Sequence, residues 1–432
     1  MGPTAMIKKI RVDDLEPGMH VCDFNMPWLR HPFLPSRMTV RRAREIDRMR
    51  RAGMTEVYID TRLGRDSARA VPAGDADREV ERRIRRDAAE APAEGPAAPR
   101  VPFAQEFRRA RRIYARARQG LRTQFDRVRS GRPVDAEQAQ DDVAGMIDSL
   151  FRNRDALLCL ARIKHFDQYT FEHSLNVAVL SLHLAIRLGI LDRELLRLGI
   201  GAVLHDLGKV RLPEGLIQKR GPFTDAEYAL VKTHPALGAR LLLETRSVPT
   251  DCAAVALRHH ERYDGSGYPR ELAGVSVGKF GLIAAVADVY DAMTTDRPYQ
   301  KGMSPTRALQ KIYGWAGTHF HPLYVRKFIQ CVGVYPVGSV VALDTGEIAV
   351  VTCQNRTDLL RPWVRLVRDA QGLPLDRPAD ADLRAPDPRG EKPFARAVAR
   401  VLPPRAAGLD VAAVLTRAPG GAGTPAPHSA AA

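Results

Sequence analysis

The feature that most limits the fold is the spacing of the apolar side chains between residues 171 and 332. They recur every three or four residues through several stretches of helical length, which predicts an all-α domain. The turns between the expected helices are marked by Pro213, Pro222, Pro235, Pro269 and Pro298. Hydrophobic residues make up 45% of the chain and aromatic residues only 6%, so aliphatic side chains must fill most of the core.

The residues before this domain predict a separate, smaller unit. Strand character at 7–12 and 57–60, with a helical pattern at 37–52 that Gly53 ends, predicts an α/β unit over residues 1–66. The whole chain is therefore expected to be mainly α, with a small α/β domain at its start and a short β-rich segment near its end.

The remaining segments are divided by composition and periodicity. Residues 67–102 are rich in Ala, Pro, Arg and Glu without hydrophobic periodicity, so we interpret them as a linker, helical in part. Helical spacing predicts connecting helices over 103–149, before the main domain at 150–335. Residues 336–385 contain three short β-like runs and predict a β-rich extension, whereas the composition of 386–432 predicts a disordered tail.

The net charge of the chain limits the classes of possible binding partner only in part. Lysine and arginine number 66 against 50 acidic residues, a formal net charge of +16 that favours anionic partners such as nucleotides, nucleic acid or acidic lipid. The arginine runs at 41–44 and 108–112 are typical of solvated helix faces. No basic motif with interleaved aromatic residues supports nucleic-acid binding, so we expect no nucleic-acid partner.

The five cysteines and the absence of long apolar stretches indicate a compartment. The cysteines form no C-x-x-C pair, which argues against a disulfide framework or a zinc ribbon and favours a reducing environment. No apolar leader follows Met1, and no stretch is long enough to span a bilayer. We therefore expect a cytoplasmic protein without a membrane partner.

The residues that carry chemistry form one ordered series of imidazoles and carboxylates. Five of the twelve histidines and two aspartates belong to it: His173, His205, Asp206, His234, His259, His260 and Asp288. Such ligands suit Fe, Mn, Co, Ni or Zn ions. Seven candidates exceed what one tetrahedral ion needs, which points to two metals roughly 3.5–4 Å apart that share a hydroxide as nucleophile.

The adjacent pair His205-Asp206 is the strongest single signal. A lone histidine on an apolar helix face is more often a satisfied core residue than a ligand. Two polar groups within the apolar run from Ala202 to Lys209, however, cost free energy unless a metal or a partner satisfies them. The pair His259-His260 repeats this feature, so a shared structural explanation is improbable.

At these residues the chain resembles a known family. His205 to Lys209 (HDLGK) resembles the signature of the HD phosphohydrolases, and residues 259–269 (HHERYDGSGYP) resemble the HHE…DG-x-GYP motif of their HD-GYP subfamily. Residues 173–178 and 288–299 are similar to further motifs of that subfamily. The resemblance covers about 150–335 and implies an HD-type helical fold. It also implies a bacterial phosphodiesterase that cleaves cyclic di-GMP to linear pGpG, in some cases on to GMP, and so lowers this second messenger.

The resemblance also implies a role for each matching residue. One metal would be held by His173, His205, Asp206 and Asp288, with Asp206 as the bridge, and the second by His234, His259 and His260. Asp206 and Lys209 would carry catalysis, Lys209 by stabilising charge on the phosphate. The implied substrate contacts are Lys209, Tyr268, Asp291, Arg297 and Lys301. The implied loop beside the metals consists of Asp264, Gly265, Gly267, Tyr268 and Pro269, with Asp264 and Asp291 as groups that orient histidines.

Some positions depart from the family pattern or extend it. Some members have a glutamate that recruits a third metal where this chain has Tyr169, so we expect two metals, Fe or Mn before Ni, Co or Zn. Position 300, often basic in the family, is Gln300. Residues 6–66 resemble the uncharacterised domain that often precedes HD-GYP domains, through the runs 17–21 and 28–33.

Two further functions remain open. The substrate can be another cyclic dinucleotide such as cyclic GMP-AMP, since no residue separates guanine from adenine. The chain can also be a catalytically weak regulatory module that binds GGDEF-type diguanylate cyclases through the loop at Tyr268. The complete ligand series argues against the second. Whether the chain forms a homodimer is not decided by its residues.

Overall fold

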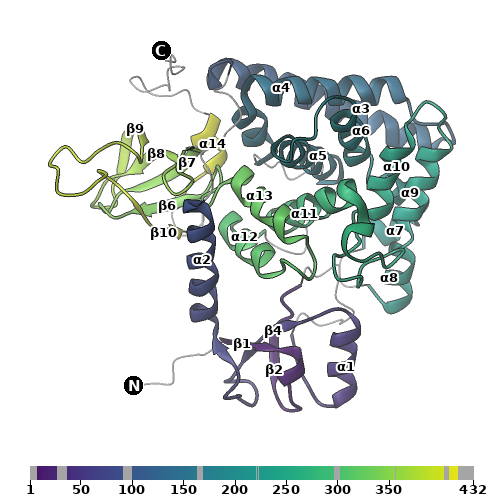
Figure 1. Cartoon of the computed structure of the whole chain (residues 1–432), viewed down its shortest axis with the longest axis horizontal. Coiled ribbons are helices and arrows are strands. Elements are labelled where there is room, and N and C mark those ends of the chain that lie inside the picture. The colour runs from purple at the N-terminus through teal and green to yellow at the C-terminus, as the bar shows by residue number, and fades with distance from the viewer. Residues whose placement is uncertain are drawn as a thin grey trace.

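The computed structural model describes residues 7–26, 37–90, 100–162, 169–219, 221, 223–295, 302–355, 357–402 and 408–416. A small N-terminal sheet domain, a large helical body and a second sheet near the C-terminus make up these residues (Figure 1). Helix α2 (Ala73–Ala89) runs from the first sheet toward the second along the side of the body. The expectation of a mainly helical chain with two small β-containing parts is confirmed.

The N-terminal domain is an antiparallel sheet with one helix. Strands β1 (Ile7–Arg11), β2 (His20–Asp23), β3 (Met38–Thr39), β4 (Glu56–Asp60) and β5 (Val71–Pro72) lie in the order β3-β2-β4-β1-β5. Helix α1 (Ala43–Arg51) covers the sheet and buries Ile46 and Met49 against Val21, Val57 and Ile59. It begins later than the predicted 37 because residues 38–39 pair with β2 instead.

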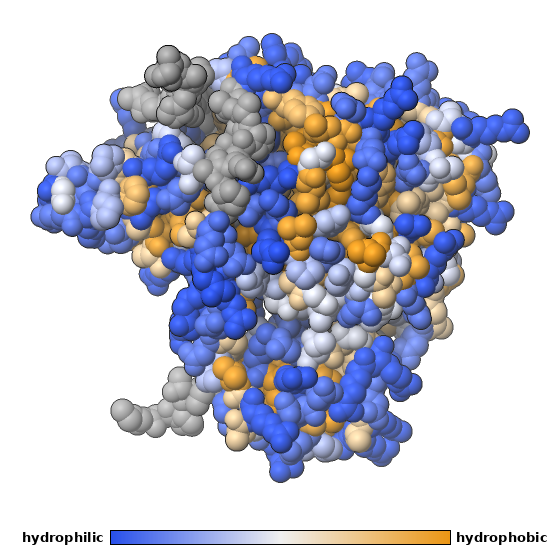
Figure 2. Space-filling view, in the orientation of Figure 1, coloured by the Kyte–Doolittle hydropathy of each residue, from blue (hydrophilic) through white to orange (hydrophobic). Residues whose placement is uncertain are grey.

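Helix α2 lies in the segment that the sequence predicted to be a linker. Its periodicity is weak because only Ile84 and Ala88, one helical turn apart, are buried. The helix is supported elsewhere by charged pairs four residues apart, such as Arg83 with Glu79 at 2.9 Å. Figure 2 shows its outer face as a hydrophilic strip. Residues 73–89 of the segment that was expected to be a linker, helical in part, form this helix.

The helical body follows the predicted periodicity. Its helices are α3 (Phe103–Arg129), α4 (Ala136–Arg162), α5 (Tyr169–Arg187), α6 (Asp192–Val203), α7 (Glu214–Ile217), α8 (Asp225–Val231), α9 (His234–Leu243), α10 (Thr250–Arg258), α11 (Gly278–Thr294), α12 (Pro305–Gly314) and α13 (Pro322–Val332). Short 3-10 helices lie at Leu207–Arg211 and Gly274–Val277. Helix α11 is buried along almost its whole length, which places it at the centre of the body. Among the described residues, no helix combines the length and the apolar character needed to cross a membrane.

The second sheet extends further along the chain than the sequence predicted. Strands β6 (Val340–Leu343), β7 (Ile348–Cys353), β8 (Trp363–Arg368), β9 (Pro374–Asp382) and β10 (Val398–Leu402) form the order β10-β6-β7-β8-β9. Strand β10 and helix α14 (Val411–Thr416) lie within the predicted disordered tail, so that prediction is wrong for these residues. Long-range pairing with β6 forms β10 where the local sequence is not distinctive.

Candidate metal centre

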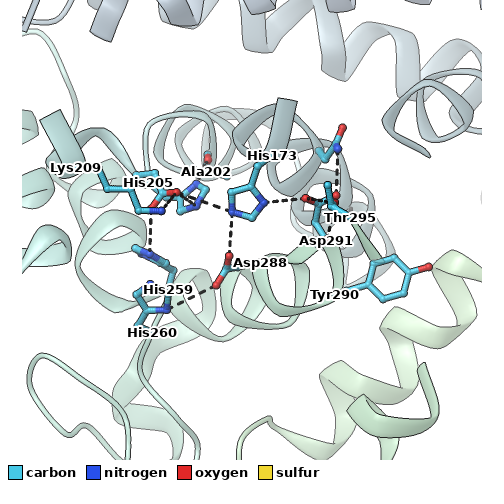
Figure 3. Close-up of polar contacts among 12 residues, drawn as sticks. His173, Ala202, His205, Lys209, His259, His260, Asp288, Tyr290, Asp291 and Thr295 are labelled. Carbon is cyan, nitrogen blue, oxygen red and sulfur yellow. Dashed lines mark hydrogen bonds and ion pairs between the residues drawn. The ribbon is translucent and has the colours of Figure 1, made fainter. Parts of the chain in front are cut away.

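Seven residues from five helices and the turns beside them meet in the interior of the body. Figure 3 labels five of them: His173, His205, His259, His260 and Asp288. They are His173 on α5, His205 and Asp206 after α6, His234 at the first position of α9, His259 and His260 at the end of α10, and Asp288 on α11. Six of them are buried, and the side chain of His260 is 13% exposed. The structure thus brings together all seven residues of the predicted series.

Three of the histidines have one ring nitrogen fixed by a backbone carbonyl. Nδ1 of His205 lies 2.7 Å from the oxygen of Ala202, and Nδ1 of His234 lies 2.7 Å from that of Val231. Nδ1 of His259 lies 2.8 Å from the oxygen of Ala256. Because a carbonyl oxygen only accepts, each Nδ1 carries the proton, and each Nε2 of a neutral ring presents a lone pair.

These lone pairs point toward one another. Nε2 of His234 and Nε2 of His259 are 3.3 Å apart, and neither can donate if both rings are neutral. Nε2 of His205 is buried and has no hydrogen-bond partner among the described residues. Acceptors held this close in the interior are unfavourable without a cation or a proton between them. The donor set therefore fits a divalent metal ion.

The candidate ligands fall into two groups around Asp206. In each group the ligand atoms lie within 4.8 Å of one another: His234, His259 and His260 in one, and His173, His205 and Asp206 in the other. Oδ1 of Asp206 is 3.3 Å from Nε2 of His234, whereas Oδ2 is 3.5 Å from Nε2 of His205. The two oxygens of one carboxylate thus face the two groups separately.

His173 is held between two carboxylates. Its Nε2 is 3.1 Å from Oδ1 of Asp288, and its Nδ1 is 2.8 Å from Oδ2 of Asp291. Burial alone would lower the pKa of His173, but hydrogen bonds to Asp288 and Asp291 outweigh it and raise this pKa to about 9. Asp291 is 2% exposed and lies behind His173, a position that suits its expected role of orienting this histidine more than a substrate contact.

A chain of hydrogen bonds supports Asp291 from the far side. Nδ2 of Asn176 donates to Oδ1 of Asp291 at 3.1 Å, and the Tyr114 hydroxyl donates to Oδ1 of Asn176 at 2.7 Å. The chain therefore runs from α3 through α5 and α11 to His173. Sequence reasoning missed both Tyr114 and Asn176, and only the position of Asn176 inside the 173–178 motif signals either of them.

The electrostatics of the other ligands suit a cation. Burial raises the pKa of Asp206 by itself, but the charge of Lys209 and the surrounding histidines hold this pKa well below its usual value. Nζ of Lys209 contacts Oδ2 of Asp206 at 2.5 Å. Burial lowers the pKa of His205 and, more strongly, that of His259, so both rings are neutral and able to bind a metal near neutral pH.

The segment from His259 to Leu272, called here the ligand loop, is closed by its own hydrogen bonds. The buried carboxylate of Glu261 accepts from the backbone N–H groups of Arg270 at 2.8 Å and Leu272 at 3.0 Å. The Tyr268 ring lies 4.7 Å from the His260 ring, between centroids. Sequence reasoning did not assign a role to Glu261, although it stands within the recognised motif.

The glycines and Asp264 shape the loop rather than contact the ligands. A Cβ at Gly267 would lie 2.3 Å from the backbone nitrogen of Arg262, so only glycine fits there. Gly265 has a positive φ of 84°. The Asp264 carboxylate accepts from the N–H and the hydroxyl of Ser266 at 2.9 and 2.7 Å. Among the described residues this carboxylate bonds Ser266 and no histidine, in contrast to its expected role in orienting a histidine.

Three sequence predictions fall on residues that the structure does not describe in full. Arg297 and Lys301, predicted to bind the substrate, lie outside the described residues, as does Gln300. Tyr169 is the first residue of α5, and its side chain is likewise outside the description.

The fold and the site define a class: a helical domain that gathers buried histidines and aspartates from several helix ends into a metal centre. Residues 154–323 match a family described as "HD domain", and residues 7–139 match one described as "Domain of unknown function (DUF3391)". The chain is 37% identical over 367 residues to the cyclic di-GMP phosphodiesterase PA4108 of Pseudomonas aeruginosa, covering 85% of this chain and 86% of that protein. This chain belongs to the HD-GYP family.

Other relatives match over shorter regions. The cyclic di-GMP phosphodiesterase response regulator RpfG of Xanthomonas campestris pv. campestris is 37% identical over 207 residues, which are 47% of this chain and 53% of that protein. The 3'3'-cGAMP-specific phosphodiesterase 1 of Vibrio cholerae is 39% identical over 137 residues, 32% of each. A solved structure, an HD-GYP-type protein (Bd1817) of Bdellovibrio bacteriovorus, aligns with a TM-score of 0.44 and 18% identity over 74% of this chain and 97% of that one.

Proposed function

We propose that this chain is a metal-dependent phosphodiesterase that hydrolyses cyclic di-GMP to linear pGpG. The observation that carries the proposal is the set of inward-facing Nε2 atoms around Asp206, whose paired acceptors fit a cation. The similarity to PA4108 over most of both chains favours cyclic di-GMP as the substrate.

We further propose two metal ions, Fe or Mn, with Ni, Co or Zn as other candidates. His173, His205, Asp206 and Asp288 would hold one ion, and His234, His259 and His260 the other, with one oxygen of Asp206 toward each. Bound there, such a pair supplies a hydroxide nucleophile at neutral pH and neutralises charge on the phosphate.

The protein side chains provide orientation and charge. The three carbonyl-bound histidines keep their Nε2 lone pairs directed inward, and the hydrogen bond to Asp291 fixes the ring of His173. Lys209, whose side chain is 27% exposed, contacts Asp206 through its ammonium group and is placed to stabilise charge on a phosphate oxygen. Tyr268, beside His260, is placed to contact a bound nucleotide.

The test is turnover by the full chain. Protein purified without oxygen and loaded with Fe(II) or Mn(II) is expected to convert cyclic di-GMP to pGpG, and His205→Ala with Asp206→Ala is expected to abolish this. Absence of turnover with every metal, or turnover that survives both substitutions, would refute the proposal. Metal analysis of the loaded protein tests the proposed count of two ions per chain, because one or three ions would contradict it.

Two other functions are outcomes of related measurements. Preferred turnover of cyclic GMP-AMP would make the chain a phosphodiesterase of that dinucleotide, as the V. cholerae relative is named. Binding of a GGDEF-type cyclase that persists in the His205→Ala, Asp206→Ala chain and is lost on changing Tyr268 would favour the regulatory module. None of the five cysteines forms a disulfide, in keeping with the cytoplasmic location that we propose.

A further inference from the structure

The N-terminal domain touches the ligand loop directly. Ala52 directly follows helix α1, and its carbonyl oxygen accepts a hydrogen bond from Nη1 of Arg262 at 3.1 Å. Nη2 of the same arginine lies 3.7 Å from the sulfur of Met26, which is also in the N-terminal domain. Arg262 is 5% exposed, so this guanidinium is buried where the domain meets the loop.

Arg262 also joins the first half of the ligand loop to the second half. Its Nη1 donates to the Ser266 hydroxyl at 3.1 Å, and Ser266 is itself fixed by Asp264. Gly267 packs against the backbone of Arg262 so closely that no side chain would fit between them. The guanidinium therefore connects the N-terminal domain to both halves of the ligand loop, the half that contains Arg262 and the half that contains Ser266.

Through the ligand loop, the position of Arg262 affects the candidate metal ligand His260. Arg262 stands two residues after His260, and the backbone N–H of Tyr268 donates to the carbonyl oxygen of His260 at 3.2 Å. The Tyr268 ring lies against the His260 imidazole. A shift of Arg262 would thus move the segment that carries both His260 and Tyr268.

A second buried contact holds the domain in place. Nζ of Lys311, on α12, donates to Oδ1 of Asn25 at 2.9 Å and lies 3.3 Å from Oδ2 of Asp23. The Lys311 side chain is 9% exposed and lies 5.4 Å from the centre of the Tyr58 ring. Lys311 thereby joins α12 to the end of β2 and the turn after it through two polar partners. The domain therefore sits on the body in a defined position.

We propose that the N-terminal domain sets the position of the ligand loop through Arg262, which acts as a positioning residue for His260 and Tyr268. This assigns a role to a domain of unknown function. The proposal deepens the proposed phosphodiesterase and rests on it only for the activity measurement.

A matched pair of glycine substitutions separates this contact from ordinary strain. Gly53 has a φ of +72°, and a Cβ there would lie 2.4 Å from Nη1 of Arg262 and 2.7 Å from Oγ of Ser266. Gly131 has a φ of +75° and no atom within 4 Å of such a Cβ. Gly53→Ala and Gly131→Ala therefore carry the same backbone strain, but only the first displaces the arginine.

The experiment follows amide hydrogen exchange and Mn²⁺ binding in the full-length variants. Gly53→Ala is expected to raise exchange about tenfold in residues 259–272, since a hydrogen bond to a charged donor is lost, and to leave β6 to β8 unchanged. It is also expected to weaken Mn²⁺ binding and to lower kcat/KM for cyclic di-GMP. Gly131→Ala is expected to do none of these. Arg262→Lys, which keeps the charge but loses the planar fork, is expected to act like Gly53→Ala.

Each outcome decides the proposal. Equal loop exchange in Gly53→Ala and Gly131→Ala overturns it, as does an unchanged loop in Arg262→Lys. A uniform rise in exchange over the whole chain would mean general destabilisation and also overturns it. If Gly53→Ala does not fold, Arg262→Lys gives the answer alone. If the wild-type chain hydrolyses no cyclic dinucleotide, the proposed function fails while exchange and Mn²⁺ binding still test the role of Arg262.

Discussion

Replacing Asp291 by Asn tests whether the support behind His173 determines metal affinity. The two oxygens of Asp291 accept from Nδ1 of His173 at 2.8 Å and from Nδ2 of Asn176 at 3.1 Å. Asparagine has nearly the same shape but only one acceptor oxygen. In Asp291→Asn, one of these two donors would therefore face an N–H group, and the negative charge behind His173 would be gone.

The size of the effect follows from this geometry. A hydrogen bond to a charged group contributes about 1.5–3 kcal/mol. Groups that orient a metal-binding histidine typically change metal affinity by about 10–100-fold, and each tenfold corresponds to about 1.4 kcal/mol. Because Asp291 is 2% exposed, water cannot easily take its place. We therefore expect Asp291→Asn to bind Mn²⁺ about 10–100-fold more weakly.

The assay is a Mn²⁺ titration of the metal-free chain against a fluorescent chelator, with thermal melting to check the fold. Asp264→Asn is the matched control, because this carboxylate accepts from Ser266 in the same region and, among the described residues, makes no hydrogen bond to a candidate metal ligand. Unchanged Mn²⁺ affinity in Asp291→Asn, or an equal loss in Asp264→Asn, would refute the reasoning.

Three further predictions concern single side chains. Lys209→Met is expected to lower kcat about 10²-fold, since a charge beside the phosphate is lost, while Mn²⁺ titration shows that metal still binds; an unchanged kcat would exclude the role. Tyr114→Phe frees the Asn176 amide and is expected to weaken Mn²⁺ binding about fivefold, the value of one neutral hydrogen bond, in the same titration. Burial raises the pKa of Tyr335 to about 12, so stability falls as pH rises above 10, where the unfolded tyrosine ionises first. Denaturant unfolding should show wild type losing about 1.4 kcal/mol more than Tyr335→Phe between pH 8 and pH 11.

The fold was predictable where apolar periodicity is strong and fails where stability comes from other sources. The helices of the body and three strands of the second sheet follow local patterns. Helix α2 buries only Ile84 and Ala88, so charged pairs and helix-forming residues replace the periodic signal. Strand β10 depends on pairing with β6, more than fifty residues earlier, which no local pattern records.

The residues of the site divide in the same way, into those that local sequence patterns predict and those that they do not. The candidate ligands were predictable because each stands in a short motif whose polar residues interrupt an apolar helix. The groups that orient them come from distant segments: Tyr114 lies 62 residues before Asn176, and Ala52 lies 210 residues before Arg262. Their side chains have ordinary surroundings in the sequence, so only the folded arrangement reveals their contacts.

One physical cause explains why some of the histidines are oriented by backbone carbonyls and His173 by a carboxylate. His205, His234 and His259 each follow the end of a helix by a few residues or less, and each bonds a carbonyl three residues earlier. Carbonyls in the last turn of a helix have no partner within the helix, and the helix dipole makes that end favourable for a cation.

His173 cannot use this arrangement, because it lies inside α5, where the carbonyls of the preceding turn are directed to the helix's own N–H groups. Its Nδ1 therefore needs a side-chain acceptor, and Asp291, one turn along α11 from Asp288, supplies it. The fold orients three of the histidines through backbone carbonyls, whereas His173 depends on one carboxylate. That difference is why Asp291→Asn should affect the His173 group while leaving the orientation of His205, His234 and His259 unchanged.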